Sequence, residues 1–412
     1  MPTTTTHPGE NGGARTIQPL QRSIWIHPLM IFGFAWGLTV YLYDLHLSAL
    51  LIYPTDLVLT VAAWVVIPFC FCVLIYLGLS WDTRPRLVLE RVQFVLGGPL
   101  ERKLKIAFWI WAALTVIEII VSGGVPILWL FQGSAKTYAD FGISSVHGLL
   151  NSLLIAIAVI HFALYALKGK KRNLIVPTFV LVWSIIAVTR NLMIVVLLEY
   201  ALVWAMIRGI AWKTVGKVFA SLLALILVFG YIGDARTGGD TFRELAQPSQ
   251  DYPEWLPSGV LWVYIYVSTP INNLVNTVQN TTPLDNVLFP NATSLLFPTV
   301  VREVLYNPTS LSDAVSGDLV TEAFNVSTAF VGPFQDFGMA GITLFSILLA
   351  LVSMHYWRNL SLLGSLTYAV LAQCLAISVF FNHLFYLPVI TQVLWFYFFL
   401  RENRRKARKS VA

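Results

Sequence analysis

Charged side chains are scarce in this sequence. Asp, Glu, Lys and Arg together make up 12% of its 412 residues, whereas 57% are hydrophobic and 14% are aromatic. With a mean hydropathy of +0.71, this composition excludes an ordinary soluble domain and indicates a chain that crosses a membrane several times. We therefore expect an all-α polytopic membrane protein built as one helical domain.

Cysteines and metal-binding patterns are also sparse. Cys70, Cys72 and Cys374 all lie inside apolar runs, which excludes a disulfide framework. The segments expected outside the membrane contain no Asp-X-Asp pair and no His/Cys cluster with the spacing of metal ligands. The sequence thus predicts neither a metal nor another cofactor, and it shows no internal repeat.

The excess of basic residues does not indicate a nucleic-acid partner. The net charge is +6 and the pI is about 9.2, but the Lys and Arg residues occupy short connections between apolar segments and a C-terminal tail. Positive charge in such places sets the orientation of a membrane protein. Nucleic acid is therefore not an expected partner.

Apolar segments of about 20 residues are long enough to span a bilayer as helices. The sequence predicts ten of them. They lie near residues 24–44, 57–80, 104–122, 143–167, 174–189, 191–207, 215–232, 326–352, 361–381 and 384–400.

The distribution of charge predicts the orientation. If the N-terminus is cytoplasmic, 22 of the 27 Lys and Arg residues fall on the cytoplasmic side, and most acidic residues fall outside. Residues 1–23 carry no cleavable signal pattern and are expected to form a flexible cytoplasmic tail. We expect a transmembrane domain over 24–400 and a basic cytoplasmic tail over 401–412.

Two of the predicted external segments are long. One comprises residues 123–142, and the other comprises residues 233–325, which is 93 residues. A connection of that length is usually functional or contains structure of its own. Within it, residues 259–279 are apolar, but Pro270 and an Asn-rich second half argue against a full span, so we expect an interfacial helix.

Five cations lie on the predicted outer side. Arg190 falls at a tight turn between two apolar segments, and a guanidinium at a membrane surface is costly unless it is paired or binds an anion. Its planar fork matches the oxygens of phosphate or pyrophosphate, and Arg190 has no carboxylate close to it in sequence. The five are Lys136, Arg190, Arg236, Arg243 and Arg302.

Two explanations of the arginines remain open. Arg236 and Arg243 are seven residues apart and would share a helix face if the Gly238–Gly239 pair did not break the helix. They could pair with acidic neighbours or bind a phosphate group. The acidic neighbours are Asp234, Asp240 and Glu244.

Several motifs resemble those of the O-antigen and capsule repeat-unit polymerases. They are "EIIVSGGVPIL" followed by "YADFGISSVHGLL", an Arg at a tight external turn, an Arg after the next outward segment, "YIYVSTPINNL" in a long external loop, and "FNVSTAFVGPFQDFGMAGITL" leading back to the membrane. The similarity covers roughly residues 110–350.

The resemblance implies a glycosyltransferase of the bacterial inner membrane, with a helical architecture similar to that of the lipid-carrier-dependent membrane glycosyltransferases. Its donor and acceptor would be oligosaccharides linked to undecaprenyl pyrophosphate and joined on the periplasmic side. Membrane lipids would surround it, and a chain-length regulator would be a further partner.

The implied chemistry suggests roles for particular residues. As an acceptor hydroxyl attacks the anomeric carbon, the pyrophosphate departs with growing negative charge, which Arg190, Arg236 and Arg243 would stabilise without a metal. His383 and Asp336 are candidate general bases. A histidine at a helix turn also caps or packs, and an acidic residue at a helix start also complements the helix dipole.

Other candidates have weaker support. Lys136 and Arg302 would contact a second phosphate or be solvated. Tyr264 and Tyr266 would stack on sugars or anchor the chain at the membrane interface. His147 would bind substrate or orient the glycine-rich turn before it. Glu118 and Glu199, as carboxylates within apolar segments, have either a functional or a structural role.

Three other functions compete with the polymerase. An O-antigen ligase uses the same donor but transfers the glycan to the lipid A core. A transporter of lipid-linked sugars would need a polar path through the membrane and commonly shows repeated halves, neither of which is evident. A scaffold without chemistry would leave the outward arginines unexplained.

Overall fold

The protein is described from a computed structural model that covers residues 23–79, 98–210, 216, 220, 239–286, 289–305, 316–359 and 361–409. Within these residues the fold is helical, and the one β-type contact is an isolated bridge between Ser48 and Pro248. The predicted all-α class is confirmed.

The helices follow the predicted apolar segments closely. Nine of the ten predicted segments coincide with helices, while 215–232 lies outside the described residues apart from Gly216 and Ala220. The long segment 233–325 contains structure of its own, since α10 to α13 fall within it. The helices are α1 (Pro28–Asp44), α2 (Thr55–Leu79), α4 (Gly98–Ser122), α5 (Pro126–Gln132), α6 (Val146–Lys168), α7 (Ile175–Ile186), α8 (Arg190–Arg208), α10 (Gly239–Ala246), α11 (Ser258–Asn280), α12 (Pro290–Thr293), α13 (Thr299–Leu305), α15 (Val331–Arg358), α16 (Leu362–Ile377) and α17 (Leu387–Lys409).

In the described part of the chain, five helical stretches are long and apolar enough to cross a bilayer. This is the pattern of a multi-pass membrane protein. The count of ten spans, the inner membrane and the cytoplasmic termini stay predictions. The five stretches are Thr55–Leu79, Pro99–Gln132 (α4 and α5 together), Val146–Lys168, Arg190–Arg208 and Val331–Arg358.

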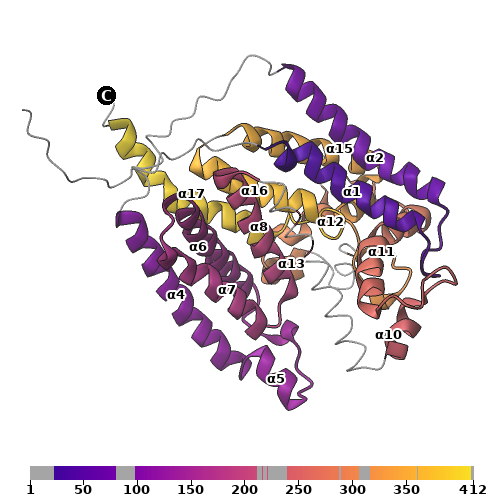
Figure 1. The fold of residues 1–412 in the computed structure, drawn as a ribbon, viewed down its shortest axis with the longest axis horizontal. Coiled ribbons are helices and arrows are strands. Elements are labelled where there is room, and N and C mark those ends of the chain that lie inside the picture. The colour runs from indigo at the N-terminus through magenta and orange to yellow at the C-terminus, as the bar shows by residue number, and fades with distance from the viewer. Residues whose placement is uncertain are drawn as a thin grey trace, which may run out of the picture.

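The helices pack into two neighbouring hydrophobic cores (Figure 1). The first contains α4, α6, α7, α8, α16 and α17, and the second contains α1, α2, α11 and α15. Helix α16 contacts α8 and α17 of the first core and α1 and α15 of the second, so it joins them. On the outside, large apolar side chains such as Ile67 and Phe71 are exposed. Lipid is the environment that suits such surfaces.

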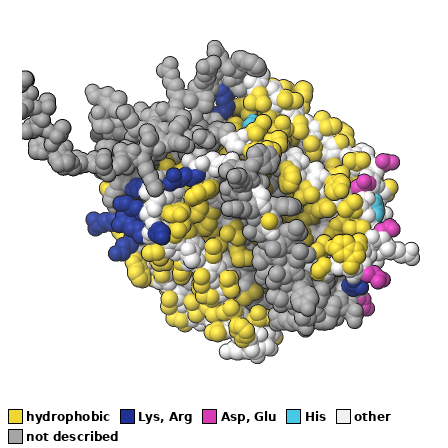
Figure 2. All heavy atoms as spheres, viewed as in Figure 1, with side chains coloured by type: hydrophobic (Ala, Val, Ile, Leu, Met, Phe, Trp, Pro, Cys, Tyr) yellow, Lys and Arg dark blue, Asp and Glu magenta, His cyan; other side chains and the backbone are white. Residues whose placement is uncertain are grey.

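On the visible face, most described Lys and Arg side chains gather at one end and the described Asp and Glu side chains at the other, where one basic group also lies (Figure 2). At the basic end, Lys168 and Arg172 lie 3.9 and 3.2 Å from the Glu101 carboxylate. At the acidic end, the turn between α1 and α2 and the segment after α10 carry exposed carboxylates, including Asp44 and Asp251. Which of the two ends faces the cytoplasm stays a prediction.

The Asn-rich half of α11 is buried in the protein. The Asn272 amide donates to the Leu50 carbonyl (2.8 Å) and accepts a hydrogen bond from the Tyr43 hydroxyl (2.9 Å). The Asn273 amide donates to the carbonyls of Phe324 and Val326 at 3.1 and 2.9 Å. These amides fasten α11 to two neighbouring loops, which explains their presence in an apolar segment. The interfacial position of this helix remains a prediction.

Helix α15 is broken near its start. Phe337 and Gly338 leave the helical conformation, and the φ of +58° at Gly338 is one that glycine adopts readily. A Cβ on Gly341 would lie 2.0 Å from the Pro333 carbonyl oxygen, so the turn packs closely against the helix that follows. The break presents Asp336 to α12.

Candidate functional site

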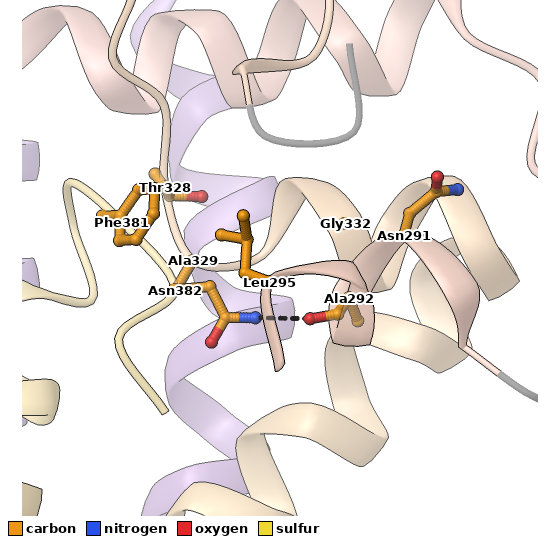
Figure 3. Close-up of a pocket in the computed structure, with 8 residues that line it drawn as sticks. All are labelled: Asn291, Ala292, Leu295, Thr328, Ala329, Gly332, Phe381 and Asn382. Carbon is orange, nitrogen blue, oxygen red and sulfur yellow. Dashed lines mark hydrogen bonds between the residues drawn. The ribbon is translucent and has the colours of Figure 1, made fainter. Parts of the chain in front are cut away.

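A small pocket lies where three segments meet, and we call this region the junction (Figure 3). The three segments are α12 with the turn that follows it (290–296), residues 328–336 at the start of α15, and the turn 378–386 between α16 and α17. The pocket is lined by Asn291, Ala292, Leu295, Thr328, Ala329, Gly332, Phe381 and Asn382.

Asp336 is fully buried at the junction. Its Oδ1 accepts the Asn291 backbone N–H at 2.9 Å, and its Oδ2 accepts the Ala292 N–H at 2.8 Å. The Asp336 carbonyl accepts the N–H of Asn286 at 2.7 Å. A carboxylate is well placed at a helix start, because it satisfies N–H groups that have no partner within the helix. Asp336 therefore holds α12 against α15.

The turn between α16 and α17 completes the junction. The Asn382 amide donates to the Ala292 carbonyl at 3.2 Å (Figure 3) and accepts the Phe385 N–H at 3.2 Å. The next residue, His383, is 2% exposed, and its Nδ1 lies 2.6 Å from Gln373 Nε2. Burial lowers the pKa of His383 to about 4. As a candidate general base, His383 was expected to have a pKa near neutrality. The ring is thus neutral at physiological pH.

Because His383 is buried, we expect the protein to lose stability at acidic pH. Its pKa is about 4 when folded and near 6.5 when unfolded, so between these pH values the unfolded chain binds a proton that the folded chain does not. The contribution of neutral His383 to the free energy of unfolding is fully present above about pH 6.5. It is lost as the pH falls toward 4, and the loss amounts to at most about 3 kcal/mol.

Thermal unfolding of detergent-purified protein across this pH range should show the decline in stability, and His383→Gln should flatten it. His355→Gln, at an exposed position, is the control. An identical decline in the wild type and His383→Gln would contradict the assignment.

Arg302, on α13, affects one residue of the junction through its charge. Its Nε is buried and has no hydrogen-bond partner. Burial raises the pKa of Tyr386, and the positive charge of Arg302 opposes that rise. The Tyr386 ring lies 5.8 Å from the His383 ring between centroids. His383 and Asp336, far apart in sequence, thus both lie at the junction.

The other predicted arginines lie elsewhere. Arg190 is the first residue of α8 and is exposed. Arg243, on α10, is half-buried and donates to the Glu254 carbonyl at 3.4 Å. Arg236 lies outside the described residues. Helix α8 belongs to the first core, whereas α10 packs on α11 of the second.

None of Arg190, Arg243 and Arg302 forms an ion pair with a carboxylate in the described ranges. Arg243 therefore forms no ion pair with its neighbour Glu244. Asp234 lies outside the described residues, as does the side chain of Asp240.

Lys136 has a structural role. Its Nζ donates to the Ser122 carbonyl at the end of α4 at 2.8 Å and lies 5.3 Å from the centre of the Trp129 ring. A cation at this position complements the negative end of the helix dipole. Binding of a phosphate by Lys136 stays a prediction and would compete with this bond.

His147 and Glu118 link α4 to α6. His147 Nδ1 lies 3.0 Å from Glu118 Oε2, and Glu118 Oε1 accepts the Ile143 N–H at 3.0 Å. Gly142 has a φ of +96°, and a Cβ on it would lie 2.6 Å from His147 Cγ. The predicted orientation of the glycine-rich turn by His147 is therefore seen in the structure, and the intramembrane Glu118 has a partner.

The remaining candidates separate into buried and accessible groups. Glu199 is buried, and its Oε2 accepts Gln392 Nε2 at 2.6 Å, which ties α8 to α17. Tyr264 is also buried, with its hydroxyl accepting the Leu47 N–H at 2.9 Å. Tyr266 is 37% exposed. Of the two tyrosines, Tyr266 is the one that could reach a sugar.

The sequence did not identify Asn382, Gln373 and Tyr386 as residues of the candidate site. Asn382 directly precedes His383 in "VFFNHLFY", and this polar pair in an apolar run is a signal that could have identified it. Gln373 and Tyr386 carry no such signal, because their importance depends on which side chains they meet.

Among the residues that the structure describes, no three His, Cys, Asp or Glu side chains gather as metal ligands would. Metal independence stays a prediction. In comparisons with known proteins, no family model, no curated protein and no solved structure matches this chain. The resemblance to the repeat-unit polymerases therefore rests on the motifs quoted above.

Proposed function

We propose that this protein is a glycosyltransferase of the bacterial inner membrane that joins oligosaccharide repeat units into O-antigen or capsule polysaccharide. Donor and acceptor are linked to undecaprenyl pyrophosphate and meet at the periplasmic face. One observation carries the proposal: Arg190, Arg243 and Arg302 lie on the predicted outer side without a carboxylate partner in the described ranges. Cations held in this way are available for an anionic ligand.

In this reaction the cations would stabilise the leaving pyrophosphate. When the anomeric carbon of the donor is attacked, its bond to the pyrophosphate oxygen breaks and negative charge grows on the leaving group. Guanidinium groups already aimed at that charge lower the barrier, since they need little reorganisation during the reaction. The planar fork of arginine fits two phosphate oxygens at once.

Arg302 supports the proposal in a particular way. Its buried Nε has hydrogen-bonding capacity that the described protein does not use, and leaving a buried donor without a partner is costly. A phosphate oxygen of the carrier or of the acceptor would satisfy it. Among the predicted cations, Arg302 is the one whose charge affects Tyr386, at the turn that also carries His383.

The proposed base must become accessible. Because His383 and Asp336 are both buried, proton removal from an acceptor hydroxyl by either one requires the junction to open. In the structure, Asp336 holds α12 against α15, and His383 contacts Gln373 of α16.

Deletion of the gene, followed by separation of lipopolysaccharide on a gel, tests the function. We expect the ladder of long chains to vanish and a band of core carrying one repeat unit to remain, because ligation continues without polymerisation. Bare core with accumulated lipid-linked polymer would instead indicate the ligase. Bare core with repeat units trapped on the cytoplasmic side would indicate a transporter. An unchanged ladder would contradict all three.

A further inference from the structure

Glu199 is a carboxyl group in the middle of α8, a helix that is long and apolar enough to cross a bilayer. Its side chain is fully buried, with 0% exposure. Arg190 and Arg208 mark the two ends of α8, and each lies nine residues from Glu199. At a rise of about 1.5 Å per residue, Glu199 lies about 14 Å along the helix from either end. Neither arginine is therefore close enough to pair with it.

In the described part of the chain, no cation compensates a negative charge on Glu199. Helix α8 packs against α6, α7, α16 and the 3-10 helix η1 (Ile24–Ile26), and α17 reaches Glu199 through Gln392. A buried ionised carboxylate without a cation is so costly that the group takes up a proton instead. Four other basic side chains are described on these elements, and none forms an ion pair with Glu199: His147, His161, Lys168 and Arg401.

One polar side chain reaches the Glu199 carboxyl. Its Oε2 lies 2.6 Å from the terminal amide of Gln392 on α17, whereas its Oε1 is buried and has no hydrogen-bond partner. The separation of 2.6 Å is shorter than the usual N–H···O distance of about 2.7–3.2 Å and falls within the range of about 2.5–3.0 Å for O–H···O. A half-turn of the amide exchanges its nitrogen and oxygen. The contact therefore fits an O–H of Glu199 that donates to the Gln392 carbonyl oxygen.

We propose that Glu199 is a proton-binding site in the interior of the helical bundle. Its protonated carboxyl donates the O–H to the carbonyl oxygen of Gln392, which is 1% exposed. An ionised carboxyl has no O–H to donate, so this hydrogen bond exists only while the proton is bound. Ionisable residues inside membrane segments are rare and commonly serve function.

The bound proton links two helices that bear on the candidate site. Helix α8 begins with Arg190, and α17 follows the turn 378–386 of the junction. The contact between Glu199 and Gln392 joins these helices. The proton site does not depend on glycosyl transfer, so it stands or fails separately from the proposed function.

Infrared difference spectroscopy of the full chain at neutral pH, in a detergent without carbonyl groups, tests the site. A protonated carboxyl and a carboxylate absorb at different frequencies. We expect the spectrum of the wild type minus that of Glu199→Gln to show a protonated-carboxyl band, because Gln keeps the shape of the side chain but cannot bind the proton. Gln392→Leu should retain this band and shift it to higher frequency, because the O–H loses its acceptor.

Glu118→Gln is the matched control. Glu118 is also buried, with 1% exposure, but its carboxylate lies 3.0 Å from the His147 ring nitrogen. This variant should retain the Glu199 band. A carboxylate band in place of the protonated-carboxyl band, an unshifted band in Gln392→Leu, or loss of the same band in Glu118→Gln would overturn the proposal. If Glu199→Gln does not fold, the band shift between the wild type and Gln392→Leu decides the matter.

Discussion

Asp336→Ala is expected to destabilise the protein by about 2–6 kcal/mol. The carboxylate is fully buried and accepts two backbone N–H groups of α12. Alanine would leave both donors without a partner inside the protein, and each buried donor left in this way costs about 1–3 kcal/mol. The measurement is thermal or denaturant unfolding of the detergent-purified chain, followed by its helical signal.

Two variants make the result specific. Asp336→Asn keeps the size of the side chain and one carbonyl oxygen, so one of the two N–H groups retains its acceptor and the loss should be smaller. Asp251→Ala removes an exposed carboxylate and should change stability by no more than about 0.5 kcal/mol. If Asp336→Ala proved as stable as the wild type but inactive in polymerisation, Asp336 would be a base rather than a structural residue.

Arg190→Lys is expected to reduce polymerisation by about 10²–10³-fold. Lysine keeps the charge but presents it as a point, so it cannot engage two phosphate oxygens with the planar fork of arginine. We expect the same direction of change for Arg243→Lys and for Arg236→Lys. The measurements are the length distribution of lipopolysaccharide in cells that carry each variant and the rate of chain extension with purified protein and lipid-linked repeat units.

The control for this series is Arg172→Lys at the basic end. Its guanidinium lies 3.2 Å from the Glu101 carboxylate, and the charge distribution predicts that it is on the cytoplasmic side. This variant should retain the wild-type ladder at equal protein levels. Wild-type ladders from all three outer variants would remove the support for a pyrophosphate site.

The sequence did not show which individual side chains are buried or which groups they contact. Of the two alternatives for His383, a general base or a residue that packs at a helix turn, its 2% exposure and its contact with Gln373 favour packing. The turn position was correct, but the pattern of apolar residues around "FNHLFY" does not show which of them cover the ring. For Lys136, which is exposed, the sequence left open a phosphate contact or solvation, and it did not show the bond to the end of α4 fourteen residues earlier.

The sequence by itself determined the class of protein, the limits of most helices and the separation of charge. These properties depend on the length, apolarity and flanking charges of continuous segments, which can be read along the chain. Only the tertiary structure decided that Asp336 and His383 share a junction and that Arg190 and Arg243 lie on helices that pack in different cores. Such contacts join residues tens of positions apart, and they depend on how helices pack and where α15 breaks. Local sequence patterns do not contain that information.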